Sequence, residues 1–161
     1  MKPRWFSKRR NYELPLMAPA VIDAYLARDL ADYNFLKKAP RAELLAHAHD
    51  LGFRYVTAPR VCQLVCNIIG TEQPRFLFHL DMGAGKSKAI LDLIRFRKAR
   101  KELQRALIVV PEYVHISSWQ DQLKEHAPDL KYVTLLGDKA DRFELIDRKA
   151  DVYLINYAGL P

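Results

Sequence analysis

The chain has 161 residues, of which 50% are hydrophobic and 28% charged, a balance typical of a globular protein with one core. No apolar run reaches the roughly 18 residues of a membrane-spanning helix, and the basic residues 1–10 are not followed by the apolar stretch of a secretory signal. These features argue against a membrane-spanning or secreted protein, and we expect a cytoplasmic one. The 26 lysines and arginines outnumber the 19 acidic residues, which suits a polyanionic partner such as nucleic acid but does not require one.

The first part of the chain, residues 1–52, predicts a basic helical extension. Apolar residues recur at helical spacing in residues 19–30 and 41–51, and Gly52 is expected to end the second of these helices. Residues 1–16 combine basic and aromatic side chains, which fits either an arm that grips nucleic acid or a solvated tail.

From about residue 53 the pattern changes to that of an α/β domain, which we expect to occupy residues 53–161. Pro59 is expected to open a helix that ends at Gly70 and carries Cys62 and Cys66 as buried core thiols. Four short apolar runs follow, alternating with helical stretches at 86–104, 113–126 and 139–149. The runs are residues 76–80, 106–110, 132–135 and 152–155. Such alternation predicts a parallel sheet flanked by helices.

The strongest chemical signal is a glycine-rich loop between the first apolar run and the helix that follows it. Gly83 and Gly85 allow a tight turn whose amides point at an anion, and the start of the helix at Lys86 adds its positive end. In such a P-loop the lysine reaches the β- and γ-phosphates of ATP and the Ser87 hydroxyl binds Mg²⁺. Leu80 stands where the full pattern has a first glycine. We expect the ATP phosphates to contact Met82, Gly83, Ala84, Gly85, Lys86, Ser87 and Lys88, with Lys86 as the catalytic residue.

Residues 81–87, Asp-Met-Gly-Ala-Gly-Lys-Ser, resemble the P-loop motif of superfamily-two helicases, in particular the branch that contains the chromatin-remodelling translocases. The segment from Pro59 to Gln63 resembles the Pro…Gln element of these proteins, although the family sets the two residues closer together. The resemblance implies a partial RecA-like domain in which Gln63 reads the adenine of ATP.

Three further segments resemble family motifs in the expected order. Residues 106–119 resemble a strand that ends in proline before a helix with a tryptophan, residues 136–142 resemble a short Gly…Arg stretch, and residues 151–157 resemble a strand that ends in Thr-Tyr-Glu. Here the last motif lacks the glutamate. The resemblance implies that nucleic acid, DNA in preference to RNA, contacts Pro111, Ser117, Ser118, Asn156 and Tyr157. Trp119 is expected to pack in the core.

The acidic motif that holds Mg²⁺ in these ATPases has no counterpart, since no Asp-Glu pair occurs in the sequence. We therefore expect an N-terminal portion of a bacterial or phage ATP-dependent helicase or translocase that by itself hydrolyses ATP poorly. Its open sheet edge is expected to meet a missing C-terminal lobe or a second copy. The alternative is a non-catalytic module that retains a P-loop and binds nucleic acid or a partner. A small-molecule kinase is a third class, but the Gln63 element and the strand and helix around Pro111 argue against it.

Overall fold

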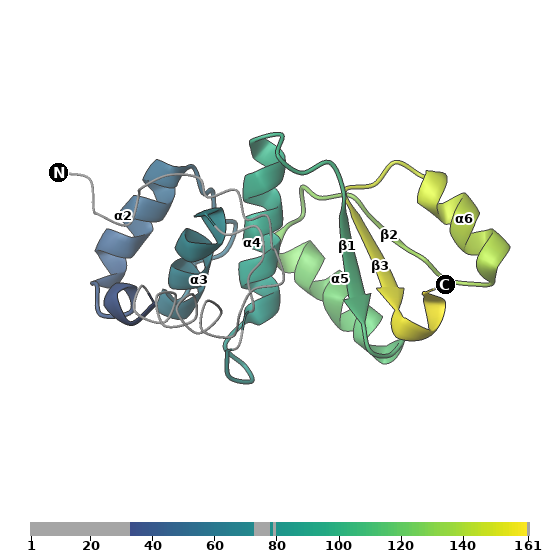
Figure 1. The fold of residues 1–161 in the computed structure, drawn as a ribbon, viewed down its shortest axis with the longest axis horizontal. Coiled ribbons are helices and arrows are strands. Elements are labelled where there is room, and N and C mark those ends of the chain that lie inside the picture. Colours follow the sequence, from purple (N-terminus) through teal and green to yellow (C-terminus); the bar gives the residue numbers. More distant parts are fainter. Residues whose placement is uncertain (1–32, 73–77, 79, 161) are drawn as a thin grey trace, which may run out of the picture.

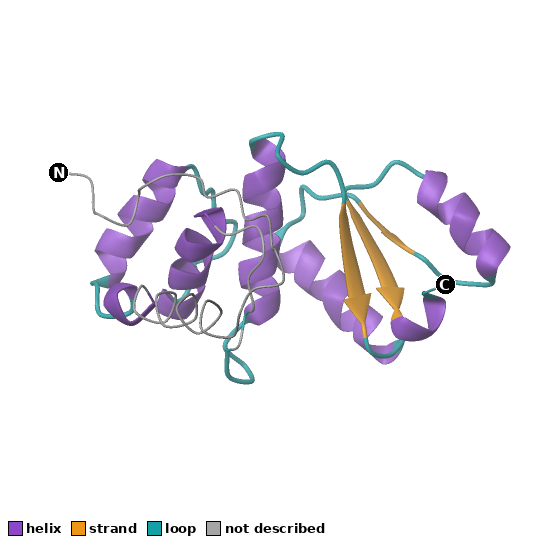
Figure 2. Cartoon of the chain, viewed as in Figure 1, coloured by secondary structure: helices purple, strands orange, loops and turns teal. Residues whose placement is uncertain are grey.

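The computed structural model describes residues 33–72, 78 and 80–160 (Figures 1 and 2). The predicted helix in residues 19–30 lies outside these residues, and so does most of the predicted strand 76–80. The described elements, in chain order, are α2 (Arg41–Leu51), α3 (Val61–Glu72), α4 (Lys86–Ala99), β1 (Ala106–Val110), α5 (Val114–His126), β2 (Tyr132–Thr134), α6 (Lys139–Asp147), β3 (Val152–Asn156) and the 3-10 turn η2 (Tyr157–Gly159). None of these helices is long and apolar enough to span a bilayer.

The three described strands form a parallel sheet in the order β1-β3-β2. In the register, Ile108 lies opposite Leu154 and Val110 opposite Asn156. One face of the sheet packs against α4 and α5 in a buried cluster that includes Ile108 and Leu154. The other face carries Tyr153, which lies in a smaller cluster with Leu145 of α6. The prediction of an α/β fold with a parallel sheet flanked by helices is confirmed, because the crossovers between parallel strands are helical.

A second core lies among α2, α3 and α4 (Figure 1). Phe53 is 1% exposed, and its ring stacks on that of Phe96 with 4.3 Å between ring centroids. Leu44 and Ala48 of α2 belong to the same core as Leu93 of α4. The described part of the N-terminal extension thus shares its core with the start of the α/β domain, and the division at residue 53 stays a prediction.

Two glycines were predicted to end helices, and one of them does so. Gly52 follows α2 in the left-handed conformation, with φ 110°, and ends it as predicted. Gly70 was expected to end α3, but the helix continues to Glu72. A Cβ on Gly70 would lie 2.7 Å from Cδ1 of Leu93, so this glycine allows α3 and α4 to approach closely.

The two cysteines of α3 differ in burial. Cys66 is buried, and this burial raises the pKa of its thiol to about 12, with a further contribution from Cys62. Cys62 is only half-buried, and its Sγ lies 3.7 Å from the carbonyl oxygen of Ala84. The prediction of two core thiols therefore holds for Cys66 and is wrong for Cys62, which lies at the start of α3 where the glycine-rich loop passes. Trp119 packs against the sheet cluster as predicted.

Candidate functional site

The glycine-rich loop turns into α4 through two residues with positive φ. Gly83 has φ 77° and Gly85 has φ 79°, a conformation that residues with a Cβ adopt at a cost. The first hydrogen bond of the helix runs from Ala89 N to Gly85 O over 3.2 Å, so the amides between these two residues have no acceptor within the helix. Lys86 begins the helix directly after the loop. The amides and the helix dipole create a positive potential at the loop, which suits a phosphate.

Two cationic side chains add to this potential. The Lys86 ammonium donates to the carbonyl oxygens of Leu80 at 2.8 Å and Asp81 at 3.0 Å, so the side chain folds back over the loop. The Arg60 guanidinium donates to the carbonyl oxygen of Gly83 at 2.8 Å. No sequence motif marks Arg60 as part of the loop, because Arg60 lies 23 residues before Gly83 and reaches it only through the packing of α3 beside the loop.

Gln63 joins the loop to the start of α3. Its side-chain oxygen accepts from the Arg60 amide at 2.8 Å, which satisfies a free donor at the helix N-terminus. Its side-chain nitrogen donates to the carbonyl oxygens of Ala84 at 3.3 Å and Gly85 at 3.1 Å. Gln63 is 3% exposed, and both ends of its amide are bound within the protein. Contact with adenine therefore stays a prediction, and it requires these bonds to be exchanged.

Lys88, expected at the phosphates, is buried between α3 and α4. Its ammonium lies 2.6 Å from the Asp92 carboxylate and 5.1 Å from the centroid of the Tyr55 ring. Burial raises the pKa of the Asp92 carboxyl, an effect that the Lys88 ammonium opposes. Asn67, fully buried, lies next to this pair and donates to the Tyr55 hydroxyl at 3.4 Å. The Lys88 side chain therefore belongs to the interface between α3 and α4. Only its backbone amide, in the first turn of α4, lies at the end of the helix that faces the loop.

The remaining loop residues are more open. Met82 is 98% exposed, and Ala84 and Ser87 are half-buried. The Ser87 hydroxyl is the Mg²⁺ ligand that the sequence predicts. Over residues 33–72, 78 and 80–160, the structure contains no group of three or more His, Cys, Asp or Glu side chains that could hold a metal ion.

The predicted nucleic-acid residues lie near the carboxyl end of the sheet. Pro111 and Tyr157 directly follow two strands whose last residues, Val110 and Asn156, are paired in the register. This pairing brings Pro111, Asn156 and Tyr157 together. The two predicted serines, Ser117 and Ser118, are exposed on α5, and the hydroxyl of Ser117 donates to the carbonyl oxygen of Val114 at 3.0 Å.

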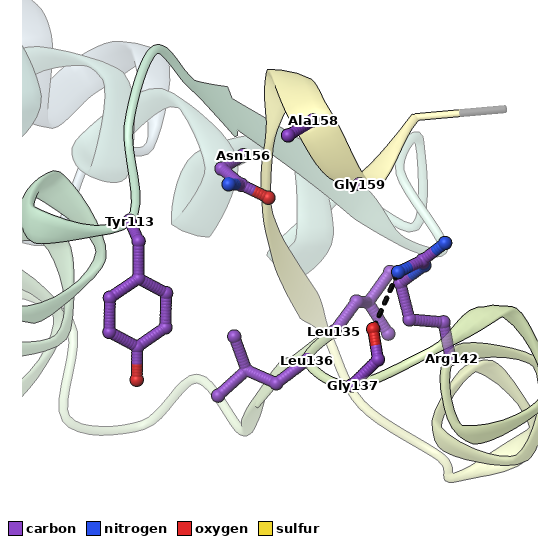
Figure 3. A pocket seen from close by; sticks show the side chains of 8 residues that line it. All are labelled: Tyr113, Leu135, Leu136, Gly137, Arg142, Asn156, Ala158 and Gly159. Atoms are coloured by element: carbon purple, nitrogen blue, oxygen red, sulfur yellow. Dashed lines mark hydrogen bonds between the residues drawn. The ribbon is translucent and has the colours of Figure 1, made fainter.

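A pocket of about 380 Å³ opens at this same end of the sheet (Figure 3). Its lining residues lie at or after the carboxyl ends of β1, β2 and β3, and these ends meet at one edge of the sheet. They are Tyr113, Leu135, Leu136, Gly137, Arg142, Asn156, Ala158 and Gly159. Of these residues, Asn156 was a predicted nucleic-acid contact, whereas Tyr113 was not. The Gly…Arg stretch of residues 136–142 was the available signal for the second missed residue, Arg142.

The sheet and the loop define the class of protein: an α/β domain with a glycine-rich loop that leads into a helix. The family model of the SNF2-related domain matches residues 4–161, so the chain belongs to the SNF2-related domain family. The resemblance stated from the sequence motifs is thereby confirmed at the level of the family.

Among solved structures, the chain is similar to one described as the Sulfolobus solfataricus SWI2/SNF2 ATPase core in complex with dsDNA. The two are 19% identical with a TM-score of 0.43, and the match covers 94% of this chain but 23% of that chain. No curated protein matches the sequence.

Proposed function

We propose that this chain binds Mg-ATP at the glycine-rich loop and forms the ATP-binding part of an ATP-dependent DNA helicase or translocase. The observation that carries the proposal is the geometry of the loop. Gly83 and Gly85 have positive φ, the amides that follow are free within the helix, and the Lys86 ammonium lies over the turn. Membership in the SNF2-related domain family supports an ATP-dependent activity of the translocase type.

Each group of the loop has a role that follows from its place. The amides at the start of α4 hold phosphate oxygens, and Lys86 exchanges its carbonyl partners for the β- and γ-phosphates. Ser87 is the residue that would hold Mg²⁺, an ion that, when bound, offsets the charge of the phosphates. Arg60 lies beside the loop at Gly83 and adds a further positive charge.

Nucleic acid is proposed to cross the carboxyl end of the sheet. Pro111, Asn156 and Tyr157 lie side by side there because Val110 pairs with Asn156. Ser117 and Ser118 lie on α5, the helix that follows Pro111. Short polar groups and exposed amides commonly bind phosphates of the nucleic-acid backbone. DNA is preferred over RNA on the strength of the family resemblance alone.

The test is ATP binding by the full chain, measured with a fluorescent ATP analogue in the presence of Mg²⁺. Lys86→Ala should weaken binding about 10- to 150-fold, because a hydrogen bond to a charged group contributes roughly 1.5–3 kcal/mol. Lys124→Ala is the matched control, since it removes one exposed positive charge from α5 and should leave binding unchanged. Equal affinity of the Lys86→Ala variant and the unmodified chain would refute the proposed site.

The same preparation tests whether the chain turns over ATP. We expect binding without efficient hydrolysis, because the sequence holds no Asp-Glu pair. Fast release of phosphate that is lost in the Lys86→Ala variant would show that this expectation is wrong.

A further inference from the structure

The pocket at the carboxyl end of the sheet is separate from the glycine-rich loop, and the two share no residue. The segments at the carboxyl ends of the strands line it: the turn before α5 supplies Tyr113, the segment after β2 supplies Leu136, and the end of β3 supplies Asn156. Arg142 reaches it from α6. In Figure 3, Tyr113 and Arg142 stand on opposite sides of the pocket, with Leu136 between them. Its volume of about 380 Å³ is at the small end of the roughly 300–1,000 Å³ of ligand pockets.

The polar groups of this pocket are left unsatisfied by the fold. Neither the Asn156 amide nor the Tyr113 hydroxyl makes a hydrogen bond within the part of the chain that the structure describes. The Arg142 guanidinium donates one bond, through Nη1 to the carbonyl oxygen of Gly137 at 2.6 Å, which orients its plane and leaves other N–H groups for a ligand.

The apolar groups of the pocket form an exposed wall and a buried floor. Tyr113 is 62% exposed and belongs to none of the buried clusters, and Leu136, which also lines the pocket, is 36% exposed. The floor is buried, since Leu135 is 4% exposed and a Cβ on Gly159 would lie 2.9 Å from Cγ1 of Ile155. An exposed aromatic ring, a free amide and a guanidinium therefore surround an apolar floor.

We propose that this pocket accepts a single unpaired nucleobase. A base is planar and presents a π-face to stack on Tyr113, and its edge offers the paired donor and acceptor that an asparagine amide recognises. Arginine planes also stack on bases and bind their edges. A phosphate would leave the Tyr113 ring without a stacking partner, and a purely apolar ligand would leave Asn156 and Arg142 unpaired. Adenine is the preferred base, since asparagine matches its edge with two hydrogen bonds.

The inference rests on the proposed function insofar as the base comes from bound DNA, and it assigns Asn156 to a base and not to the backbone. A free nucleoside presents the same chemistry, so the two sources are separated by experiment. Adenosine is the suitable probe for the second source, because it lacks the phosphates that the glycine-rich loop would bind.

The experiment measures binding of the full chain to three labelled DNAs by fluorescence anisotropy. One is a fully paired duplex, the second carries one unpaired adenine, and the third carries an abasic site in place of that adenine. The adenine-containing DNA should bind about 5- to 150-fold more tightly than the abasic one, the range that stacking of one base on an aromatic ring supplies. Tyr113→Ala should abolish this difference, whereas Tyr113→Phe, which keeps the ring, should retain it. A fourth DNA, with an unpaired thymine in place of the adenine, measures the preference for adenine, which Asn156→Ala should reduce.

Phe35→Ala is the matched control, since Phe35 is 67% exposed and does not line the pocket. Equal affinity for the adenine and abasic DNAs, with duplex binding intact, would refute the proposal that the pocket accepts a base, and it would leave the proposed function unaffected. Absence of binding to every DNA would instead contradict the nucleic-acid part of the proposed function, and adenosine would then decide the pocket. Adenosine binding that Tyr113→Ala removes would support a nucleobase site for free nucleosides, and undetectable adenosine binding would overturn it.

Discussion

Gly83 and Gly85 form a matched pair for testing how the glycine-rich loop is held. Both have positive φ, 77° and 79°, so alanine at either position is strained in the same way. Their surroundings differ, however. A Cβ on Gly83 would meet nothing within 4 Å, whereas a Cβ on Gly85 would lie 2.1 Å from Nε2 of Gln63. The Gln63 amide must therefore move in Gly85→Ala and not in Gly83→Ala.

The difference between the two substitutions can be derived from the bonds of Gln63. Left-handed backbone costs a residue with a Cβ about 1–2 kcal/mol, which is the whole effect expected for Gly83→Ala. Displacing the Gln63 amide also breaks its bonds to the carbonyl oxygens of Ala84 and Gly85, each contributing about 0.5–1.5 kcal/mol. Because Gln63 is 3% exposed, water cannot readily replace these bonds. We expect Gly85→Ala to lower the free energy of unfolding by about 2–5 kcal/mol.

Urea unfolding followed by circular dichroism measures these changes in a double-mutant cycle. In a Gln63→Ala background the space beside Gly85 is empty, so Gly85→Ala should cost no more than Gly83→Ala does. The coupling between positions 63 and 85 should thus be about 1–3 kcal/mol. Equal destabilisation by the two glycine substitutions, or a coupling near zero, would refute the reasoning.

Two further predictions concern the interior of α3 and α4. Lys88 is 4% exposed, and Asp92→Ala leaves its ammonium without a partner, which should lower the free energy of unfolding by about 3–5 kcal/mol. Replacing both residues by leucine and methionine should lower it far less. A loss below about 1 kcal/mol for Asp92→Ala in urea unfolding would contradict this reasoning. Cys66, whose pKa burial raises from 9.0 to about 12, should resist iodoacetamide at pH 8 while Cys62 reacts, as peptide mass mapping can show. Because the unfolded thiol loses its proton first, the protein should lose stability as the pH rises from 9.0 towards 12. Cys66→Ala should make this loss smaller, and the part that is left includes Tyr55, whose pKa is also raised by burial. Equal labelling of both cysteines would count against the burial of Cys66.

The sequence by itself determined the features whose causes are local. The glycine-rich loop was predictable because two glycines with positive φ and a helix that begins at Lys86 are adjacent in the chain. The parallel strands were predictable from short apolar runs separated by helical stretches. Gly52 ended α2 as expected, since a left-handed residue after a helix depends on the backbone alone.

The tertiary structure decided every feature that depends on contact between distant segments. Gly70 resembles a helix stop in the sequence, but the approach of Leu93 makes it a packing residue inside α3. Lys88 follows the residues that are predicted to bind phosphate, yet its position on α4 directs its side chain into the interface with α3. Gln63 contacts the loop across 22 residues of sequence. Neither spacing nor composition specifies which helix faces come together, because that depends on how the whole core packs.

The pocket at the carboxyl end of the sheet shows the same division. Asn156 could be singled out from a motif at the end of a strand, but Tyr113 and Arg142 acquire their meaning only when β1, β2 and β3 lie in parallel and their ends meet. A parallel sheet gathers at one edge the segments that follow its strands, and so it joins residues that are far apart in the chain. The sequence thus determined that a glycine-rich loop leads into a helix, and the sheet decided which side chains surround the pocket at its edge.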